Sequence, residues 1–320
     1  MNSIQPTTAP LRDTLAAGRP LGRPDPQGAL LSPTTPTTGT GPLISVVIPA
    51  HNGARWLREA AESVLSQEGV DLELVIADHG STDDTQSVMT RLARSDSRVR
   101  LVTLPPGGGA EAGWNGATSA ATGTYLKLLC QDDSLQPGVL ARQAQLLNEN
   151  PDAALTACRR DLVDAEGRTM LRGWGLKGFT TTVDGATATR RAILQGTNPF
   201  GEPGCVLMRR TLLLQVGGWD GQRPYVIDLA TYFKLLTHGS FVPDLTTGAV
   251  FRVSHQQVSF DLRHVQARQV RALHRDALAA ETAARRWPLM LAGALAAAAA
   301  QTGRRVIYRL DTILRRKDLR

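Results

Sequence analysis

The chain has 320 residues, a hydrophobic content of 42% and a formal net charge of +7. This length and composition allow one sizeable α/β core with a helical appendage. The positive charge depends on the C-terminal tail and no RNA- or DNA-binding motif accompanies it, so we expect no nucleic-acid partner. The three cysteines, Cys130, Cys158 and Cys205, are scattered, which excludes a clustered zinc-binding spacing and a disulfide framework and fits a reducing cytoplasm.

Residues 1–42 are rich in Pro, Thr and Gly and show no sustained hydrophobic periodicity, so we expect them to be disordered. They also lack the basic segment followed by an apolar segment that marks a secretory signal. We therefore expect a cytoplasmic protein whose folded part begins at residue 43.

Strands and helices alternate in the chain that follows. Apolar, β-branched runs predict the strands, and apolar residues at helical spacing predict the helices between them. In chain order we expect a strand at Leu43–Pro49, a helix at Arg55–Gln67, a strand at Leu72–Ala77, a helix at Asp84–Ala93 and a strand at Val99–Thr103. This alternation predicts βαβ units in a Rossmann-like, mostly parallel sheet flanked by helices.

A further apolar run, Tyr125–Asp133, ends in two adjacent carboxylates. We expect a buried strand here, followed by a helix near Gln136–Leu147. Two interpretations of the carboxylates are open. Asp132 and Asp133 can hold Mg²⁺ or Mn²⁺ while phosphate oxygens and water complete its coordination, or they can start the next loop and cap the helix.

Polar loops follow three of the predicted strands. Because the carboxyl ends of parallel strands meet at one edge of a sheet, these loops should face a single crevice. The loops are Pro49–Gly53, Asp78–Asp83 and Asp132–Asp133. Asp78 can accept a hydrogen bond from a nucleobase N–H, and Ser81 suits a ribose or phosphate. We expect Asp83 to cap the helix after it.

The ordered set VVIPAHN, ADHGSTD and YLKLLCQDD resembles the family 2 glycosyltransferases, over roughly Ile44 to His255. The resemblance implies an inverting enzyme of the GT-A fold that uses a nucleotide-diphospho-sugar, and a UDP-sugar is the favoured donor. It also implies that Asp132 ligates Mn²⁺ or Mg²⁺. The donor contacts expected from it are Pro49, Ala50, His51, Asn52, Asp78, Ser81, Asn115, Gln131 and Asp132.

The predicted donor-binding segments depart from the family pattern at three positions. Cys130 stands at the first position of the usual D-x-D-D motif, and His79 stands where a second acidic residue is common. Trp114 replaces the Arg or Lys that many members place before the position of Asn115. These changes bear on which base and sugar are bound, and they leave Asp132 in place.

An inverting transfer needs a base that takes the proton from the acceptor hydroxyl. The segment Pro224–Leu236 resembles the late acidic helix of the family, whose Asp is the catalytic base, and that position is Asp228 here. Ile227 replaces the acidic residue that usually precedes it. The alternative is that Asp228 only stabilises the N-terminus of its helix.

The segments around this helix complete the resemblance. Gly201–Asp220 resembles the floor of the acceptor side, in which we expect Trp219 to pack and Asp220 to be a candidate acceptor contact. His255 stands where the family often has a His near the diphosphate or metal. It could ligate the metal, pair with phosphate, or lie in a surface loop, and Arg252 could serve the phosphates instead.

The C-terminal region changes to Ala, Arg and Leu with helical character. Pro288–Ala300 is apolar for 13 residues, short of the roughly 20 that a membrane-spanning helix needs. Beyond it, basic residues from Arg304 to Arg320 alternate with apolar ones. This pattern suits an amphipathic helix at the inner face of an anionic membrane, or a helix that packs on the catalytic domain. We therefore expect three parts, 1–42, 43–258 and 259–320.

The sequence thus predicts an inverting glycosyltransferase that moves a sugar to a saccharide or lipid-linked acceptor, in polysaccharide, cell-envelope or glycolipid synthesis. A nucleotide-sugar-binding protein without transferase activity is the alternative, because Cys130, His79 and Ile227 stand at positions that the family usually makes acidic. A dinucleotide-binding oxidoreductase ranks lower, because no G-x-G-x-x-G follows the first strand.

Overall fold

The computed structural model describes residues 43–254 and 265–299, all of which belong to one compact unit. Several predictions fall outside these residues. They concern the segment 1–42, the boundary after residue 258, His255 and the basic tail from Arg304.

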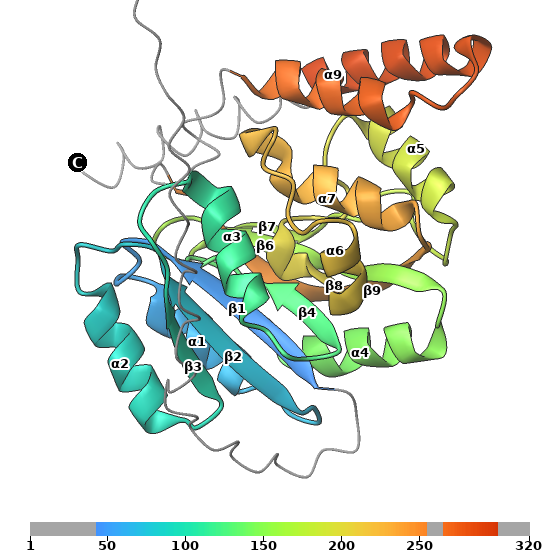
Figure 1. Cartoon of the computed structure of the whole chain (residues 1–320). Coiled ribbons are helices and arrows are strands. Elements are labelled where there is room, and N and C mark those ends of the chain that lie inside the picture. Colours follow the sequence, from blue (N-terminus) through green and yellow to red (C-terminus); the bar gives the residue numbers. More distant parts are fainter. Residues whose placement is uncertain (1–42, 255–264, 300–320) are drawn as a thin grey trace, which may run out of the picture. The chain divides into compact units, whose positions relative to one another are not determined.

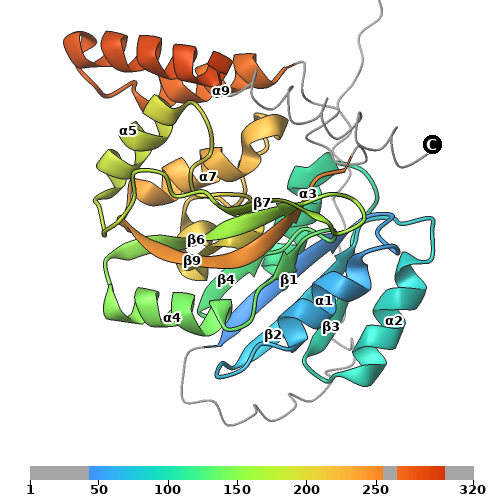
Figure 2. The ribbon, with the colours of Figure 1, turned by 180° about the vertical axis from the view of Figure 1, so that it is seen from behind.

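The first half of the fold is a parallel sheet with helices on both faces (Figure 1). The strands lie in the order β3-β2-β1-β4 and all their pairings are parallel. Their bounds are β1 Ile44–Ala50, β2 Leu72–Asp78, β3 Val99–Thr103 and β4 Tyr125–Leu128. The helices are α1 Leu57–Leu65, α2 Thr85–Ser95 and α3 Gly109–Ser119. Figures 1 and 2 show α1 and α2 on one face of the sheet and α3 on the other.

The second half continues the same sheet in the order β8-β6-β9-β5, and β7 pairs with β6. Here β6 and β9 are parallel, while the pairings of β8, β7 and β5 are antiparallel. The strands are β5 Ser134–Leu135, β6 Ala153–Val163, β7 Thr169–Trp174, β8 Val206–Arg209 and β9 Ser240–Arg252. The helices are α4 Val139–Glu149, α5 Gly185–Gln195, α6 Arg210–Gln215 and α7 Ile227–Leu236, with short 3₁₀ turns η1 Pro203–Cys205 and η2 Pro224–Val226. The predicted α/β class is confirmed.

A buried lysine joins the two halves of the sheet. Lys127 on β4 is fully buried, and its Nζ donates to the carbonyls of Gly204 at 2.8 Å and Val206 at 3.2 Å. Burial holds the pKa of Lys127 below its usual value, and these carbonyls solvate the ammonium that remains. The contact fixes η1 against the end of β4, where the acidic turn begins.

The C-terminal helices pack against α5 and η2. α9 spans Gln266–Ala277, and a second helix covers residues 283–299. Arg190 on α5 pairs with Glu281 at 2.7 Å, and the Tyr225 amide donates to the Gln269 side chain at 2.8 Å. Within the described ranges, no helix combines the length and the apolar character needed to cross a membrane.

His274 is a buried histidine of this helical region that makes folding sensitive to acid. It is 2% exposed, and neither ring nitrogen has a hydrogen-bond partner among the described residues. Burial lowers the pKa of His274 to about 4, below the 6.5 of an unperturbed imidazole. The imidazole of His274 therefore takes up a proton more readily in the unfolded chain than in the folded one. As pH falls from about 6.5 through 4, this difference lowers the free energy of unfolding.

We therefore expect His274→Leu to remove part of the acid sensitivity of folding. The parent should lose on the order of 3 kcal/mol of unfolding free energy through this group between pH 7 and pH 4, and the variant should not. Urea unfolding at the two pH values measures the difference. His238→Leu, at an exposed histidine, is the matched control. Equal acid sensitivity in His274→Leu and the parent would contradict the assignment.

Candidate active site

The loops after β1 and β4 are held together by one glutamine. The Gln131 side chain accepts from the His51 amide at 2.8 Å and donates to the His51 carbonyl at 2.9 Å. The side-chain amide of Gln131 thus satisfies the N–H and the carbonyl of His51, as a neighbouring strand would. The His51 ring in turn lies 2.9 Å from the His79 carbonyl, in the loop after β2. Predicted residues from three separate loops thus meet at one edge.

Asn52 joins the same edge to the β2 loop. It has a left-handed backbone with φ +50°, a conformation that Asn tolerates better than most residues. Its amide donates to the Ser81 hydroxyl at 3.0 Å, and its side-chain oxygen accepts from the Thr82 amide at 2.8 Å. Asp83 accepts from the Thr85 amide at 3.0 Å at the start of α2, but the N-cap residue of this helix is Asp84, one residue after the predicted cap.

Asp78 ends β2 and is 2% exposed. Its carboxylate accepts from the Ser81 amide at 3.1 Å and from Gln86 at 2.8 Å. Burial acts to raise the pKa of Asp78, but these hydrogen bonds outweigh it and the net pKa is lowered. Asp78 is therefore a fixed anionic acceptor at this edge of the sheet.

Gly53 leaves the space that Gln131 occupies. A Cβ at Gly53 would overlap the amide of Gln131. We expect Gly53→Ala to displace that side chain, to cost about 1–3 kcal/mol of stability and to weaken nucleotide binding. Thermal unfolding and calorimetry with UDP and Mn²⁺ measure both effects. Because Gln131→Ala removes the clash, the double variant should be less impaired than the sum of the single variants; simple additivity would contradict this contact.

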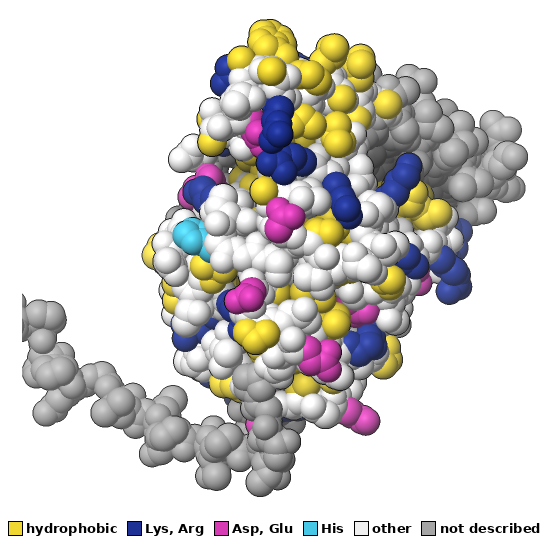
Figure 3. Space-filling view, turned by 90° about the vertical axis from the view of Figure 1, so that its right-hand side faces the viewer, with side chains coloured by type: hydrophobic (Ala, Val, Ile, Leu, Met, Phe, Trp, Pro, Cys, Tyr) yellow, Lys and Arg dark blue, Asp and Glu magenta, His cyan; other side chains and the backbone are white. Residues whose placement is uncertain are grey.

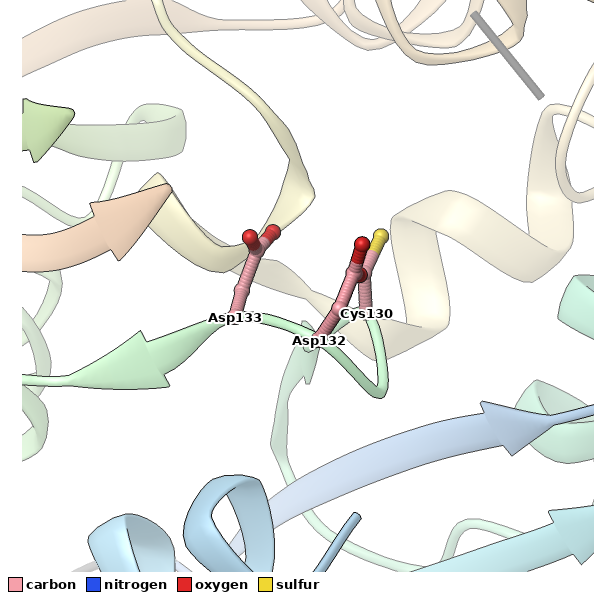
Figure 4. A group of neighbouring side chains, drawn as sticks. All are labelled: Cys130, Asp132 and Asp133. Atoms are coloured by element: carbon pink, nitrogen blue, oxygen red, sulfur yellow. The ribbon is translucent and has the colours of Figure 1, made fainter. Parts of the chain in front are cut away.

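The turn between β4 and β5 carries the acidic cluster. Cys130, Asp132 and Asp133 each offer a ligand atom, and these atoms all lie within 4.8 Å of one another. Figure 4 shows the three side chains rising to the same side of the turn. The pKa of Asp133 is raised well above its usual range, mainly by burial and secondly by the charge of Asp132. A bound divalent cation would relieve this repulsion, so the two carboxylates fit a hard metal ion, which prefers oxygen ligands to the Cys130 thiol.

Arg252 supports the acidic turn from β9. Its amide donates to the Asp133 carboxylate and its Nε to the Asp132 carbonyl, both at 3.0 Å. Its guanidinium also binds both carboxylate oxygens of Glu59 at 2.7 Å. With 4% of its surface exposed, Arg252 is placed to hold the turn in position.

Asp228 lies in the first turn of α7. One carboxylate oxygen accepts from the Leu229 amide and the other from the Asn198 side chain, both at 2.7 Å. Burial raises the pKa of Asp228 to about 6, and the charge of Glu202 adds to this while the two hydrogen bonds oppose it. A carboxylate with this pKa can accept a proton near neutral pH.

Glu202 is a site residue that the sequence did not single out. It precedes η1 and forms a two-pronged ion pair with the buried Arg160, with one contact at 3.2 Å. The pKa of the Cys130 thiol is raised well above its usual value by burial and then by four carboxylates. In order of effect these are Asp133, Asp132, Glu202 and Asp228. All four therefore act on one point at the end of β4. An acidic residue in a Gly-Pro turn was the only sequence signal for Glu202.

Three other predicted residues have structural partners. The Asn115 amide exchanges two hydrogen bonds with the backbone of Trp219, at 2.8 and 3.1 Å. Trp219 is 1% exposed, as expected for a packing residue. Asp220 pairs with Lys234 at 2.9 Å and accepts from the Gln222 amide at 3.0 Å. Neither Trp219 nor Asp220 presents a free face to an acceptor.

The site therefore has two sides. The loops after β1 and β2 offer backbone groups and the Asp78 carboxylate, and the acidic turn offers metal ligands. Asp228, in the first turn of α7, has a pKa raised to about 6, and its charge acts on Cys130 in that turn. A parallel sheet with such loops at its carboxyl edge and an acidic turn after β4 is a GT-A glycosyltransferase architecture.

The chain belongs to glycosyl transferase family 2, whose model matches residues 45–217, more than half of its length. It is similar to a chondroitin synthase of Pasteurella multocida, with 35% identity over 140 residues; the match covers 43% of this chain and 14% of that one. In fold it resembles S. aureus TarS 1–349 in complex with UDP-GlcNAc, with a TM-score of 0.57 and 17% identity over 77% of this chain and 70% of that one. It also resembles the mannosyltransferase PcManGT from Pyrobaculum calidifontis in complex with GDP-Man and Mn²⁺, with a TM-score of 0.58 and 20% identity over 84% of this chain and 77% of that one.

Proposed function

We propose that this protein is an inverting, metal-dependent glycosyltransferase. It moves a sugar from a nucleotide-diphospho-sugar to a hydroxyl of a saccharide or lipid-linked acceptor, in polysaccharide, cell-envelope or glycolipid synthesis. We assign the catalytic domain to residues 43–258. The observation that carries the proposal is Asp228, a carboxylate with a pKa of about 6 whose charge acts on the same point as the acidic turn.

In the proposed site, Asp78 and the loop Pro49–Asn52 bind the nucleoside, and Ser81 and Gln131 hold that loop in place. Asp132, with Asp133 behind it, would hold Mn²⁺ or Mg²⁺. When bound, the cation would offset the charge of the diphosphate leaving group. Asp228 takes the proton from the acceptor hydroxyl as this attacks the anomeric carbon from the opposite side.

The base of the donor nucleotide has to be identified by experiment. The two fold neighbours were solved with UDP-GlcNAc and with GDP-Man, so their common fold does not select the base. We favour a UDP-sugar. The test is a screen of UDP-, GDP- and dTDP-sugars with Mn²⁺ and with Mg²⁺, in which mass spectrometry detects the released nucleoside diphosphate. Binding without release from any donor would favour the alternative, a nucleotide-sugar-binding protein.

We further propose that the helix at residues 283–299 contacts an anionic membrane. Trp287, Leu291 and Leu295 recur every fourth residue, so they share one face, and they are 71%, 63% and 66% exposed. Hydrophobic side chains also gather at the top of Figure 3. The chain after this helix carries seven Lys and Arg against two Asp from Arg304 to Arg320, which suits anionic headgroups.

Sedimentation with vesicles of phosphatidylcholine, with and without phosphatidylglycerol, tests this contact. We expect binding only with phosphatidylglycerol, and binding about tenfold weaker in Leu291→Ser or Leu295→Ser. Leu101→Ser, at an exposed leucine on β3, is the control. If the face formed by Trp287, Leu291 and Leu295 instead joins two copies of the chain, the leucine variants will change the oligomeric state and not the vesicle binding.

A further inference from the structure

The exposed Trp174 lies next to the residues that position the candidate base. It is 52% exposed at the end of β7 and is the middle residue of the sequence Gly173–Trp174–Gly175, in which both glycines have positive φ. In the described part of the chain its indole has neither a ring partner nor a hydrogen bond. A large aromatic surface kept in solvent loses the free energy that burial would give, so a ligand is a reason to keep it there.

Strand register places Trp174 on the face that carries the Glu202 ion pair. Trp174 is paired with Arg160 across the antiparallel strands β6 and β7. Residues directly opposite each other in such a pair project to the same face of the sheet. Arg160 uses that face to bind Glu202, whose charge acts on Asp228. A bulge at Gly173, whose amide donates to Asp161 at 2.8 Å, sets this register.

A second connection leads from Trp174 to Asp228 along the backbone. The Leu176 amide, two residues after Trp174, donates to the Pro199 carbonyl at 2.9 Å. The residue before Pro199 is Asn198, which donates to the Asp228 carboxylate at 2.7 Å. Gly175 fits between the two segments, since a Cβ there would lie 3.0 Å from Arg160 Nη1 and 3.7 Å from the Pro199 carbonyl oxygen.

The surface around Trp174 is also apolar. Leu171 on β7 is 36% exposed and pairs with Leu162 on β6, which in turn pairs with Phe251 on β9. Leu162 and Phe251 are both partly exposed. Arg252, which follows Phe251, holds the acidic turn. The apolar surface therefore runs from Trp174 on β7 across β6 to Phe251 on β9, whose neighbour in the chain holds the acidic turn.

We propose that Trp174 is the stacking platform of the acceptor-sugar subsite. The C–H face of a pyranose ring would lie on the indole, with a ring hydroxyl directed to Asp228. This inference rests on the proposed function, because it gives the acceptor of the same reaction a place to bind.

The test uses methyl β-D-glucopyranoside and methyl β-D-galactopyranoside as probes, with full-length protein in the presence of UDP and Mn²⁺. Saturation-transfer-difference NMR should show transfer to the C–H protons of one ring face in the parent. Trp174→Ala should reduce the transfer about tenfold, while Trp174→Phe should keep part of it, because a smaller aromatic face remains. Leu101→Ala, at an exposed apolar residue on β3, should leave it unchanged. Thermal unfolding verifies that the variants fold.

The outcomes separate this inference from the function on which it rests. If the parent binds and cleaves a nucleotide sugar but Trp174→Ala keeps the full transfer signal, or the parent shows none with either glycoside, the acceptor subsite is wrong and the glycosyltransferase stands. If no nucleotide sugar is bound or cleaved by the parent, the proposed function fails first.

Discussion

Asp228→Asn is expected to abolish glycosyl transfer while nucleotide binding persists. The amide is nearly isosteric and can still accept one of the two hydrogen bonds that Asp228 receives, from Leu229 or from Asn198. It cannot take a proton, and loss of a general base costs on the order of 10²–10⁴-fold in rate. Single-turnover assays measure the rate, and calorimetry with UDP and Mn²⁺ measures binding. Parent-like turnover in this variant would exclude Asp228 as the base.

The pH profile makes the assignment specific. Since the base acts as a carboxylate and its pKa is about 6, kcat/KM should fall as pH falls below about 6. Asn198→Ala removes a hydrogen bond that lowers this pKa, so the acid limb should move to higher pH. Glu202→Gln removes a charge that raises it, so the limb should move to lower pH. A carboxylate with a purely structural role would not give opposite shifts.

Asp132→Ala is expected to remove metal-dependent donor binding. Asp132 is partly exposed on the acidic turn, whereas Asp133 is 4% exposed and accepts from the Arg252 amide. Asp132 is therefore the carboxylate better placed to reach a bound cation. We expect nucleotide affinity in the presence of Mn²⁺ to fall on the order of 100-fold, with little change in its absence.

Calorimetry with UDP, with Mn²⁺ and with EDTA, measures this difference. Asp152→Ala is the matched control, because Asp152 is exposed and precedes β6 at the opposite edge of the sheet. The same loss of affinity in EDTA as in Mn²⁺ would show that Asp132 acts on the fold or the nucleoside and not through a metal.

Local sequence was sufficient for the first half of the fold. The ends of β1 and β2 lie within one residue of prediction, and β3 has the predicted bounds. These strands are continuous apolar runs bounded by turn residues, so their limits need no knowledge of distant partners. The order of the three polar loops, and their position at one edge, follow from the same alternation.

Long-range contacts decided the second half. Strands β6 and β7 and helix α5 were not predicted, because their sequences mix charged and apolar residues. Arg160 can be buried in β6 only because Glu202 neutralises it across 42 residues of chain. The predicted strand Tyr125–Asp133 is also divided, since β4 ends at Leu128 and the Asp133 amide turns back to the Cys130 carbonyl at 3.1 Å. That turn lets the carboxylates project together.

The sequence by itself determined the family resemblance, the acidic turn with Asp132, and Asp78 at the end of its strand, because these depend on residues close together in the chain. Only the tertiary structure decided which charges share the site and which aromatic residue is available to a ligand. The charge of Glu202 acts on Asp228, Trp219 is buried, and Trp174 is exposed. Exposure and charge pairing depend on which distant segments pack together, and a pattern of neighbouring residues does not contain that information.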